Sequence, residues 1–346
     1  MSTKCYLLGA GASYGYDEHL SDAERPPLSN EFFSKGNRLG LFTEDRYPRL
    51  YQALTEYIDL FSVENPDIEK FLSWLATDFF RLSKSGLQIK ADFERTIFLQ
   101  CALGESFYFI YDVFRHYSLS YKARFDCYRR LALHYFDEKY TVISLNYDTL
   151  FENAILSVNG SFHYLPPRRH PNSIPIAKFH GSINWFNPFG RAIAYGGLKE
   201  EAFKTIVCSV FSNRSWMEPM IILHPLVLSG VEIKDLVRSG TDYDEPALIP
   251  PLENYKDYEK VERYKEVWSF AESMLRDATE LIIIGCSIRR EDKKLEEFLL
   301  KDFNRNATIT IVNRHPEKIR DRLVEIFQAP NIKEQFYSFG EYIKTL

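Results

Sequence analysis

The chain has 346 residues, of which 45% are hydrophobic and 15% are aromatic, and its formal net charge is −5 at pH 7. This composition is typical of a globular protein with a sizeable core, and the acidic balance argues against a general affinity for nucleic-acid backbones. The five cysteines are scattered without a C-x-x-C pair, so we expect neither a disulfide framework nor a tetrathiolate zinc site. Because we find no signal-peptide pattern and no run of about 18 apolar residues, we expect a cytoplasmic protein without a membrane span.

The N-terminal part of the chain combines one predicted strand with a long helical region. Residues 4–9, KCYLLG, are an apolar run that ends in glycine, which is typical of a buried strand. The stretch NPDIEKFLSWLATDFFRL has its apolar residues at helical spacing, and Asn65-Pro66 is a signal for a helix start. The segment TIFLQCALGESFYFIYDVFRHY continues as a long, aromatic-rich helix.

Strands and helices alternate in the rest of the chain. Strand patterns occur in YTVISLNYD, residues 140–148, and then in PIAKFHGS, PMIILHP, ELIIIGCS and ATITIVN. Helices are predicted in YKDYEKVERYKEVWSFAESMLRDA, REDKKLEEFLLKDF and HPEKIRDRLVEIF. Apolar strands that alternate with helices predict a parallel sheet covered on both faces. We therefore expect an α/β, Rossmann-like domain made of residues 1–35 and 138–346, interrupted by a helical insertion at residues 36–137.

The stretch LLGAGASYGY, residues 7–16, places three glycines directly after the first predicted strand. Gly9 and Gly11 permit a sharp turn and a close approach of a diphosphate to the backbone. The spacing departs from the dinucleotide fingerprint G-x-G-x-x-G because Tyr14 occupies the place of the third glycine, and no clear acidic residue follows about 20 residues later. By itself, the stretch therefore fits a diphosphate turn and a purely structural turn equally well.

Small or polar residues follow five of the predicted strands. In an open parallel sheet, ligands bind at the carboxyl ends of the strands, where the strand order changes direction. Such a set of hydrogen-bonding groups suits a nucleotide with two riboses, a diphosphate and an amide. In chain order the residues are Gly9, Gly11 and Ser13; Asn146 and Asp148; His180, Gly181 and Ser182; Ser287; and Asn313.

The segments GAGAS, NYD, FHGS, GCS and VN resemble the sirtuin family in their order and context, from residue 9 to residue 313. The combination SLNYDTLFE, KFHGSINW and IIIGCSIRREDKKLEEFL resembles especially the bacterial sirtuin-like branch of anti-phage defence, whose members cleave NAD. The resemblance implies a role for each matching position. Gly9, Ala10, Gly11, Ala12 and Ser13 would hold the diphosphate and the neighbouring ribose, Asn146 and Asp148 would line the nicotinamide end, His180 would be the base, Ser287 and Asn313 would bind the adenosine side, and Gly285 would belong to the same cofactor site.

The resemblance thus implies an NAD glycohydrolase that releases nicotinamide and ADP-ribose without a metal, with NAD as its substrate. Breaking an N-glycosidic bond builds oxocarbenium character on the ribose, and an amide and an imidazole suit substrate binding and proton transfer. A role as a regulated effector of anti-phage defence implies a homo-oligomer or a separate sensor or ATPase partner. It implies no membrane and no direct nucleic-acid binding.

Two other functions stay open at this point. A protein deacylase or ADP-ribosyltransferase would use the same NAD site, although the chain lacks the two cysteine pairs that hold zinc in protein-deacylating sirtuins. A non-catalytic sensor would bind NAD or ADP-ribose without turnover.

The singled-out residues also have structural interpretations. Asn146 and Asp148 suit the start of a helix, and Ser287 and Asn313 suit turns between a strand and a helix. The run RREDKKLEEF is interpreted as a solvated helix face with paired opposite charges. The segment LPPRRHP, residues 165–171, is interpreted as a surface linker rather than as a basic loop for a polyanion.

Overall fold

The computed structural model describes residues 3–84, 90–121, 126–164, 173–188, 220–221, 243–251 and 255–346. The chain divides into two compact units. The first unit comprises Met1–Leu28, Tyr117–Ser182 and Arg263–Leu346, and the second comprises Ser29–His116 and Ile183–Glu262. The segment LPPRRHP and most of the predicted strand PMIILHP lie outside the described residues.

The first unit is built on a seven-stranded sheet with the order β10-β9-β8-β1-β2-β4-β3. All neighbouring strands in it run parallel. The central strands are largely apolar and are buried along nearly their whole length, as expected of a sheet covered on both faces. This confirms the α/β, Rossmann-like fold. The strands are β1 (Lys4–Leu8), β2 (Tyr140–Ser144), β3 (Ser161–His163), β4 (Ser173–Lys178), β8 (Glu280–Ile284), β9 (Thr308–Val312) and β10 (Ile332–Phe336).

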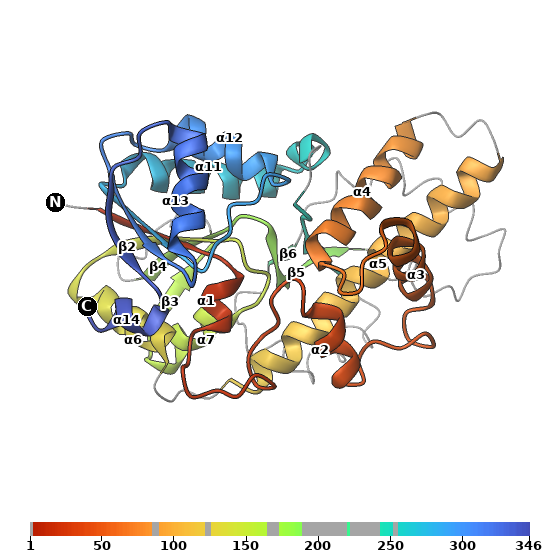
Figure 1. Cartoon of the computed structure of the whole chain (residues 1–346), viewed down its shortest axis with the longest axis horizontal. Helices are drawn as coiled ribbons and strands as arrows, with labels where there is room; N and C mark the ends of the chain where they lie inside the picture. The colour runs from red at the N-terminus through yellow and green to blue at the C-terminus, as the bar shows by residue number, and fades with distance from the viewer. Residues whose placement is uncertain are drawn as a thin grey trace. The chain divides into compact units, whose positions relative to one another are not determined.

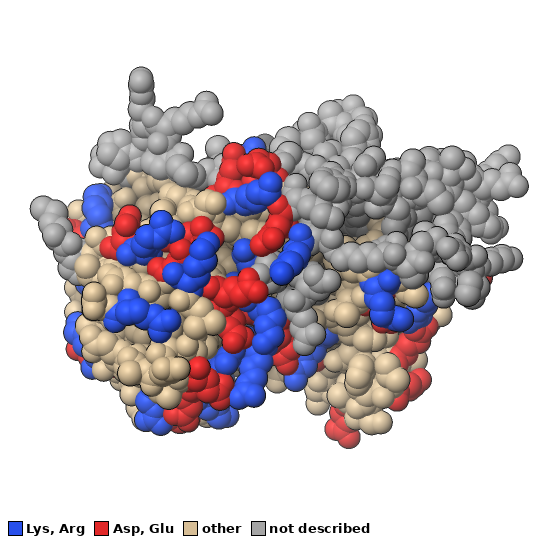
Figure 2. All heavy atoms as spheres, turned by 90° about the horizontal axis from the view of Figure 1, so that it is seen from above, with Lys and Arg blue, Asp and Glu red and all other residues tan. Residues whose placement is uncertain are grey.

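Helices cover both faces of this sheet (Figure 1). On one face lie α11 (Glu262–Asp277), α12 (Lys293–Asp302) and α13 (Pro316–Phe327). On the other lie α6 (Cys127–Asp137), α7 (Leu150–Ser157) and α14 (Phe339–Ile343), with the short α1 (Ala10–Tyr14) directly after β1. Acidic and basic side chains are interspersed over the face seen in Figure 2. Ion pairs on the helices of this unit include Lys293 with Glu296 and Arg322 with Glu325.

Helix α6 belongs with the sheet and not with the other helices of the predicted insertion. It packs against α7 and α14, and its buried Tyr128 contacts the rings of Phe151 and Phe339. Residues 183–262 also belong to the second unit. The compact units therefore begin and end at other residues than the predicted insertion at 36–137.

The second unit combines helices with a three-stranded sheet of order β6-β5-β7. Its aromatic core includes Phe33, Phe42 and Phe109, whose rings lie within 5.0–5.7 Å of one another. Within the described part of the chain, one helical stretch, Glu94–Leu119, is long and apolar enough to cross a membrane, but 72% of the tested window is buried inside the protein, which is the burial of a core helix. The elements are α2 (Phe32–Arg38), α3 (Pro48–Phe61), α4 (Ile68–Lys84), α5 (Lys90–Leu119), β5 (Gly181–Pro188), β6 (Met220–Ile221), β7 (Tyr243–Leu248) and the 3₁₀ helix η3 (Tyr255–Lys260).

The loops after β1 and β8 meet backbone to backbone at the point where the strand order reverses. The amides of Gly9 and Gly11 donate to the carbonyl oxygens of Ile284 and Gly285 at 2.9 and 2.8 Å. A Cβ atom on Gly11 would lie 2.8 Å from the Cα of Gly285, and Gly285 itself has a φ of +61°. The glycines are therefore required by this close approach, whether or not a ligand binds beside them.

We expect Gly285→Ala to lower the free energy of unfolding by about 2–4 kcal/mol, because the added methyl group combines positive-φ strain with overlap against the backbone of Ala12. Gly40→Ala is the matched control, since Gly40 has a φ of +65° but no atom within 4 Å of the Cβ position. We expect it to cost about 1 kcal/mol. Urea unfolding followed by circular dichroism measures both values, and equal losses would contradict the packing argument.

Candidate functional site

The ends of five strands are level with one another along one edge of the sheet. In the register, Leu8 of β1 pairs with Ser144 of β2 and with Ile284 of β8. Ser144 in turn pairs with Lys178 of β4, and Ile284 pairs with Val312 of β9. The residues that follow these strands therefore leave the sheet from one row. In the order β9, β8, β1, β2 and β4 they are Asn313; Gly285 and Ser287; Gly9 to Ser13; Asn146 and Asp148; and His180.

The hydroxyl of Ser13 is the centre of a buried polar network beside this edge. It donates to Asp148 Oδ2 at 2.7 Å, lies 3.0 Å from the hydroxyl of Tyr128, and accepts from Asn146 Nδ2 at 3.0 Å. All four side chains are buried, so each supplies a partner that another needs away from water. The network joins α1, α6 and the loop after β2.

The side chain of Asn146 is held in one orientation. Its Nδ2 donates to the carbonyl oxygen of Gly9 at 3.0 Å as well as to Ser13. A carbonyl oxygen can only accept a hydrogen bond, so the amide nitrogen must face Gly9. Both amide hydrogens are thereby committed to the protein. Asn146 would therefore contact a ligand through its Oδ1 atom, as a hydrogen-bond acceptor.

Asp148 has the structural role that the sequence left open. Its Oδ1 accepts from the backbone nitrogen of Leu150, the first residue of α7, at 3.0 Å, while its Oδ2 accepts from Ser13. Asp148 thus supports the start of α7. Asn146 lies four residues before Leu150, outside the first turn of α7, and its side-chain nitrogen binds Gly9 and Ser13.

A buried ion pair that sequence reasoning missed lies under the loop after β2. Lys178 Nζ is 3.3 Å from Glu152 Oε1 and donates to the carbonyl oxygen of Asp148. Tyr164 donates to the same Glu152 oxygen at 3.0 Å. Burial raises the pKa of Glu152, and the Lys178 ammonium opposes that rise. A lysine in an otherwise apolar strand, PIAKF, was the available signal.

His180 follows β4 and is paired with a carboxylate from α12. Its Nε2 lies 2.8 Å from Asp292 Oδ2, and the two side chains are only 9% and 7% exposed. Asp292 lies in the run RREDKKLEEF that the sequence predicted to be a solvated face. That prediction is wrong for Asp292, because its position at the start of α12 turns its side chain inward.

The glycine turn uses its backbone amides within the protein. The amides of Gly9 and Gly11 bind the β8 end, and that of Ala12 donates to the Gly9 carbonyl oxygen at 2.9 Å. Ala10 is the first residue of α1. The structural interpretation of the turn therefore has a direct basis in its contacts, and the diphosphate role stays a prediction.

The two residues predicted for the adenosine side differ in their surroundings. Ser287 is exposed. Asn313 donates from Nδ2 to the carbonyl oxygen of Cys286 at 3.1 Å and accepts from the amide of His315 at 3.1 Å. It thus ties the loop after β8 to the start of α13. Ile288, in the same loop, has a φ of +45°, which is rare for a β-branched residue.

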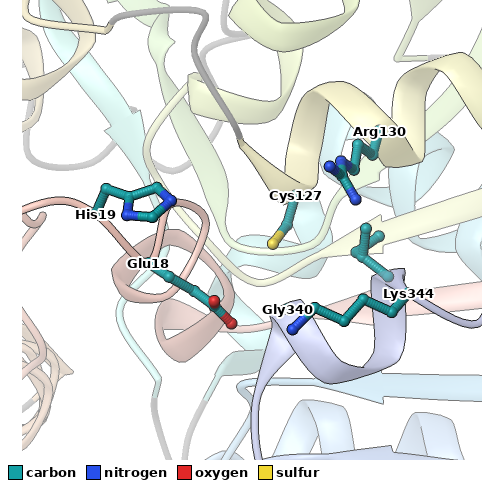
Figure 3. A pocket seen from close by; sticks show the side chains of 7 residues that line it. Glu18, His19, Cys127, Arg130, Gly340 and Lys344 are labelled. Atoms are coloured by element: carbon teal, nitrogen blue, oxygen red, sulfur yellow. The ribbon is translucent and has the colours of Figure 1, made fainter.

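A cavity of about 240 Å³ is lined by residues of α6, of α14 and of the segment after α1 (Figure 3). No predicted site residue lines it. Burial raises the pKa of the Cys127 thiol to about 12, so this sulfur stays protonated and unreactive at neutral pH. The lining residues are Glu18, His19, Cys127, Arg130, Gly340, Ile343 and Lys344.

Comparison with known proteins gives matches only among solved structures. No protein-family model and no curated protein sequence matches the chain. One similar structure is from work on the structural basis of sirtuin substrate affinity, with 13% identity and a TM-score of 0.41 over 99% of this chain and 92% of that one. Another is Sir2 in complex with the inhibitor EX-527, 2′-O-acetyl-ADP-ribose and a deacetylated p53 peptide, with 12% identity and a TM-score of 0.39 over 99% and 91%. Likeness at this level does not define the substrate or the chemistry of this chain.

We expect Lys178→Met to destabilise the protein by about 3–5 kcal/mol, because it leaves the Glu152 carboxyl buried without its cation. The double variant Lys178→Met/Glu152→Gln should recover part of that loss. Urea unfolding of both single variants, the double variant and the wild type gives the coupling energy. Additive losses would show that the two side chains do not interact.

Proposed function

We propose that this protein cleaves the bond between nicotinamide and ribose in NAD, with water as the acceptor, and releases nicotinamide and ADP-ribose. The observation that carries the proposal is the level register that sets Asn146 and His180 after neighbouring parallel strands, β2 and β4. Neighbouring strands are about 4.8 Å apart, so groups on the two loops can reach one ribose. The sirtuin-like motifs of the sequence supply the choice of NAD.

In this proposal Asn146 binds the acceptor water or a ribose hydroxyl. Its Oδ1 accepts a hydrogen bond, because the amide nitrogen is held by Gly9 and Ser13. The Ser13 network is buried and linked to the start of α7 through Asp148. The oxygen is therefore held in place before substrate arrives, which lowers the cost of orienting the reacting group.

His180 acts as the general base. It takes a proton from the water or from a ribose hydroxyl, the water oxygen bonds to the ribose carbon, and the carbon–nitrogen bond breaks. The electron pair of that bond goes to the pyridine nitrogen, so nicotinamide leaves as a neutral molecule. General-base help of this kind is worth about 10² to 10⁴ in rate.

The remaining predicted residues would bind the rest of NAD at the same edge. Ser287 supplies an exposed hydroxyl beside the point where the strand order reverses. Gly9, Gly11 and Gly285 pack against one another there. Because they have no side chains, the backbone leaves room for a ligand above it. NAD enters as the substrate, and no metal takes part in the proposed step.

We expect wild-type protein to release nicotinamide from NAD, and His180→Ala to reduce kcat/KM by about 10² to 10⁴. Asn146→Ala should reduce it as well, because the acceptor oxygen is lost. His134→Ala is the matched control, since His134 pairs with Glu138, which binds Lys4 at the opposite edge of the sheet. Chromatography of the products with and without acetylated peptide separates hydrolysis from deacylation. Nicotinamide that is released only in the presence of the peptide would overturn the proposed hydrolase activity.

The sequence resemblance extends the proposal to a regulated effector of anti-phage defence, held in check within a homo-oligomer or by a partner protein. NAD is needed by every cell, so an unregulated hydrolase would be toxic to its host. We expect bacteria that express the wild-type chain with its native neighbouring genes to lose NAD after phage infection, while cells with His180→Ala keep it. Equal NAD levels in the two strains throughout infection would contradict the effector role.

A further inference from the structure

One carboxylate joins the end of β4 to the start of α12. Asp292 Oδ1 accepts from the backbone nitrogen of Leu295 at 3.1 Å and thereby caps α12. Its other oxygen, Oδ2, lies 2.8 Å from His180 Nε2. Both acceptor atoms of Asp292 are thus used, one for the helix and one for the imidazole.

The contact between β4 and α12 is fixed by more than this pair. The ring of Phe179, next to His180, lies 5.1 Å from that of Phe298 on α12. The indole nitrogen of Trp268 on α11 donates to the carbonyl oxygen of Phe179 at 2.9 Å. Helices α11 and α12 therefore both hold the backbone that carries His180, so we expect Asp292 and His180 to keep their relative position.

A carboxylate partner decides which nitrogen of His180 can act as a base. An ionised carboxylate only accepts hydrogen bonds, so Nε2 carries the hydrogen and the neutral ring has its lone pair on Nδ1. When Nδ1 takes a proton, the ring becomes a cation beside the buried negative charge of Asp292, which stabilises it. The pairing therefore favours both the correct tautomer and a stronger base.

A helix cap alone does not require aspartate at this position. Serine, threonine and asparagine cap helices as well, and Ser338 caps α14 in this protein. We propose that Asp292 is a positioning residue that holds His180 in the Nε2-protonated form and so makes Nδ1 the proton acceptor. This inference rests on the proposed role of His180 in NAD cleavage.

The test compares three substitutions. Asp292→Asn keeps the cap and the size, but its amide nitrogen would donate to Nε2 and move the ring hydrogen to Nδ1. Asp292→Ser keeps the cap and is too short to reach the ring. Asp302→Asn is the control, because Asp302 is a buried carboxylate at the far end of the same helix, paired with Arg276.

We expect nitrogen-15 NMR of histidine side chains to show Nε2-protonated His180 in the wild type, assigned by its loss in His180→Gln. In Asp292→Asn we expect the Nδ1-protonated form. For nicotinamide release we expect kcat/KM to fall further in Asp292→Asn than in Asp292→Ser, by about 10² or more for the former. Asp302→Asn should leave the tautomer and the activity unchanged.

The outcomes separate this inference from the proposed function. An Nδ1-protonated His180 in the wild type, or an unchanged tautomer in Asp292→Asn, would overturn the inference without any use of NAD. If kcat/KM fell less in Asp292→Asn than in Asp292→Ser, Asp292 would act only as a helix cap. This result would also overturn the inference. A wild type with the expected NMR signature that releases no nicotinamide would overturn the proposed function, and with it the catalytic meaning of the pairing.

Discussion

The close approach of the loops after β1 and β8 is the constraint on which the rest of the first unit depends. Gly9 and Gly11 bind the backbone at Ile284 and Gly285, and no larger residue fits between them. This contact joins the two loops at the point where the strand order reverses, and α1 begins directly after Gly9. Ser13 on α1 then reaches the loop after β2, because the ends of β1 and β2 are level in the register.

Two carboxylates at this edge of the sheet each stabilise the start of a helix and also bind a proposed site residue. Asp148 supports α7 and binds Ser13, while Asp292 caps α12 and binds His180. Such double use follows from burial, since every polar atom removed from water needs a partner. The atoms left for a ligand are then few and well defined. Asn146 offers a ligand its oxygen Oδ1, because its amide nitrogen binds Gly9 and Ser13.

Much of this arrangement was predictable from the sequence. The apolar runs at residues 4–9 and 140–148 and in ELIIIGCS and ATITIVN became parallel strands, as expected of short β-branched runs in a sheet buried on both faces. The polar residues after them were identified by their position alone. Asp292 and the Lys178–Glu152 pair were not, since a helix cap and a buried lysine follow no periodic pattern. Helix α6 has a helical pattern like the rest of the predicted insertion, yet it packs against α7 and α14 of the first unit.

The sequence by itself determined the order of elements, the parallel sheet and the residue types at the strand ends, because these follow from local hydrophobic periodicity and turn chemistry. It did not determine which atoms of those residues stay available. Only the tertiary structure decided that the amide nitrogen of Asn146 faces Gly9 and that Asp292 Oδ2 meets His180. Those contacts join residues more than 100 positions apart, and hydrogen-bond direction is fixed only when both partners are in place.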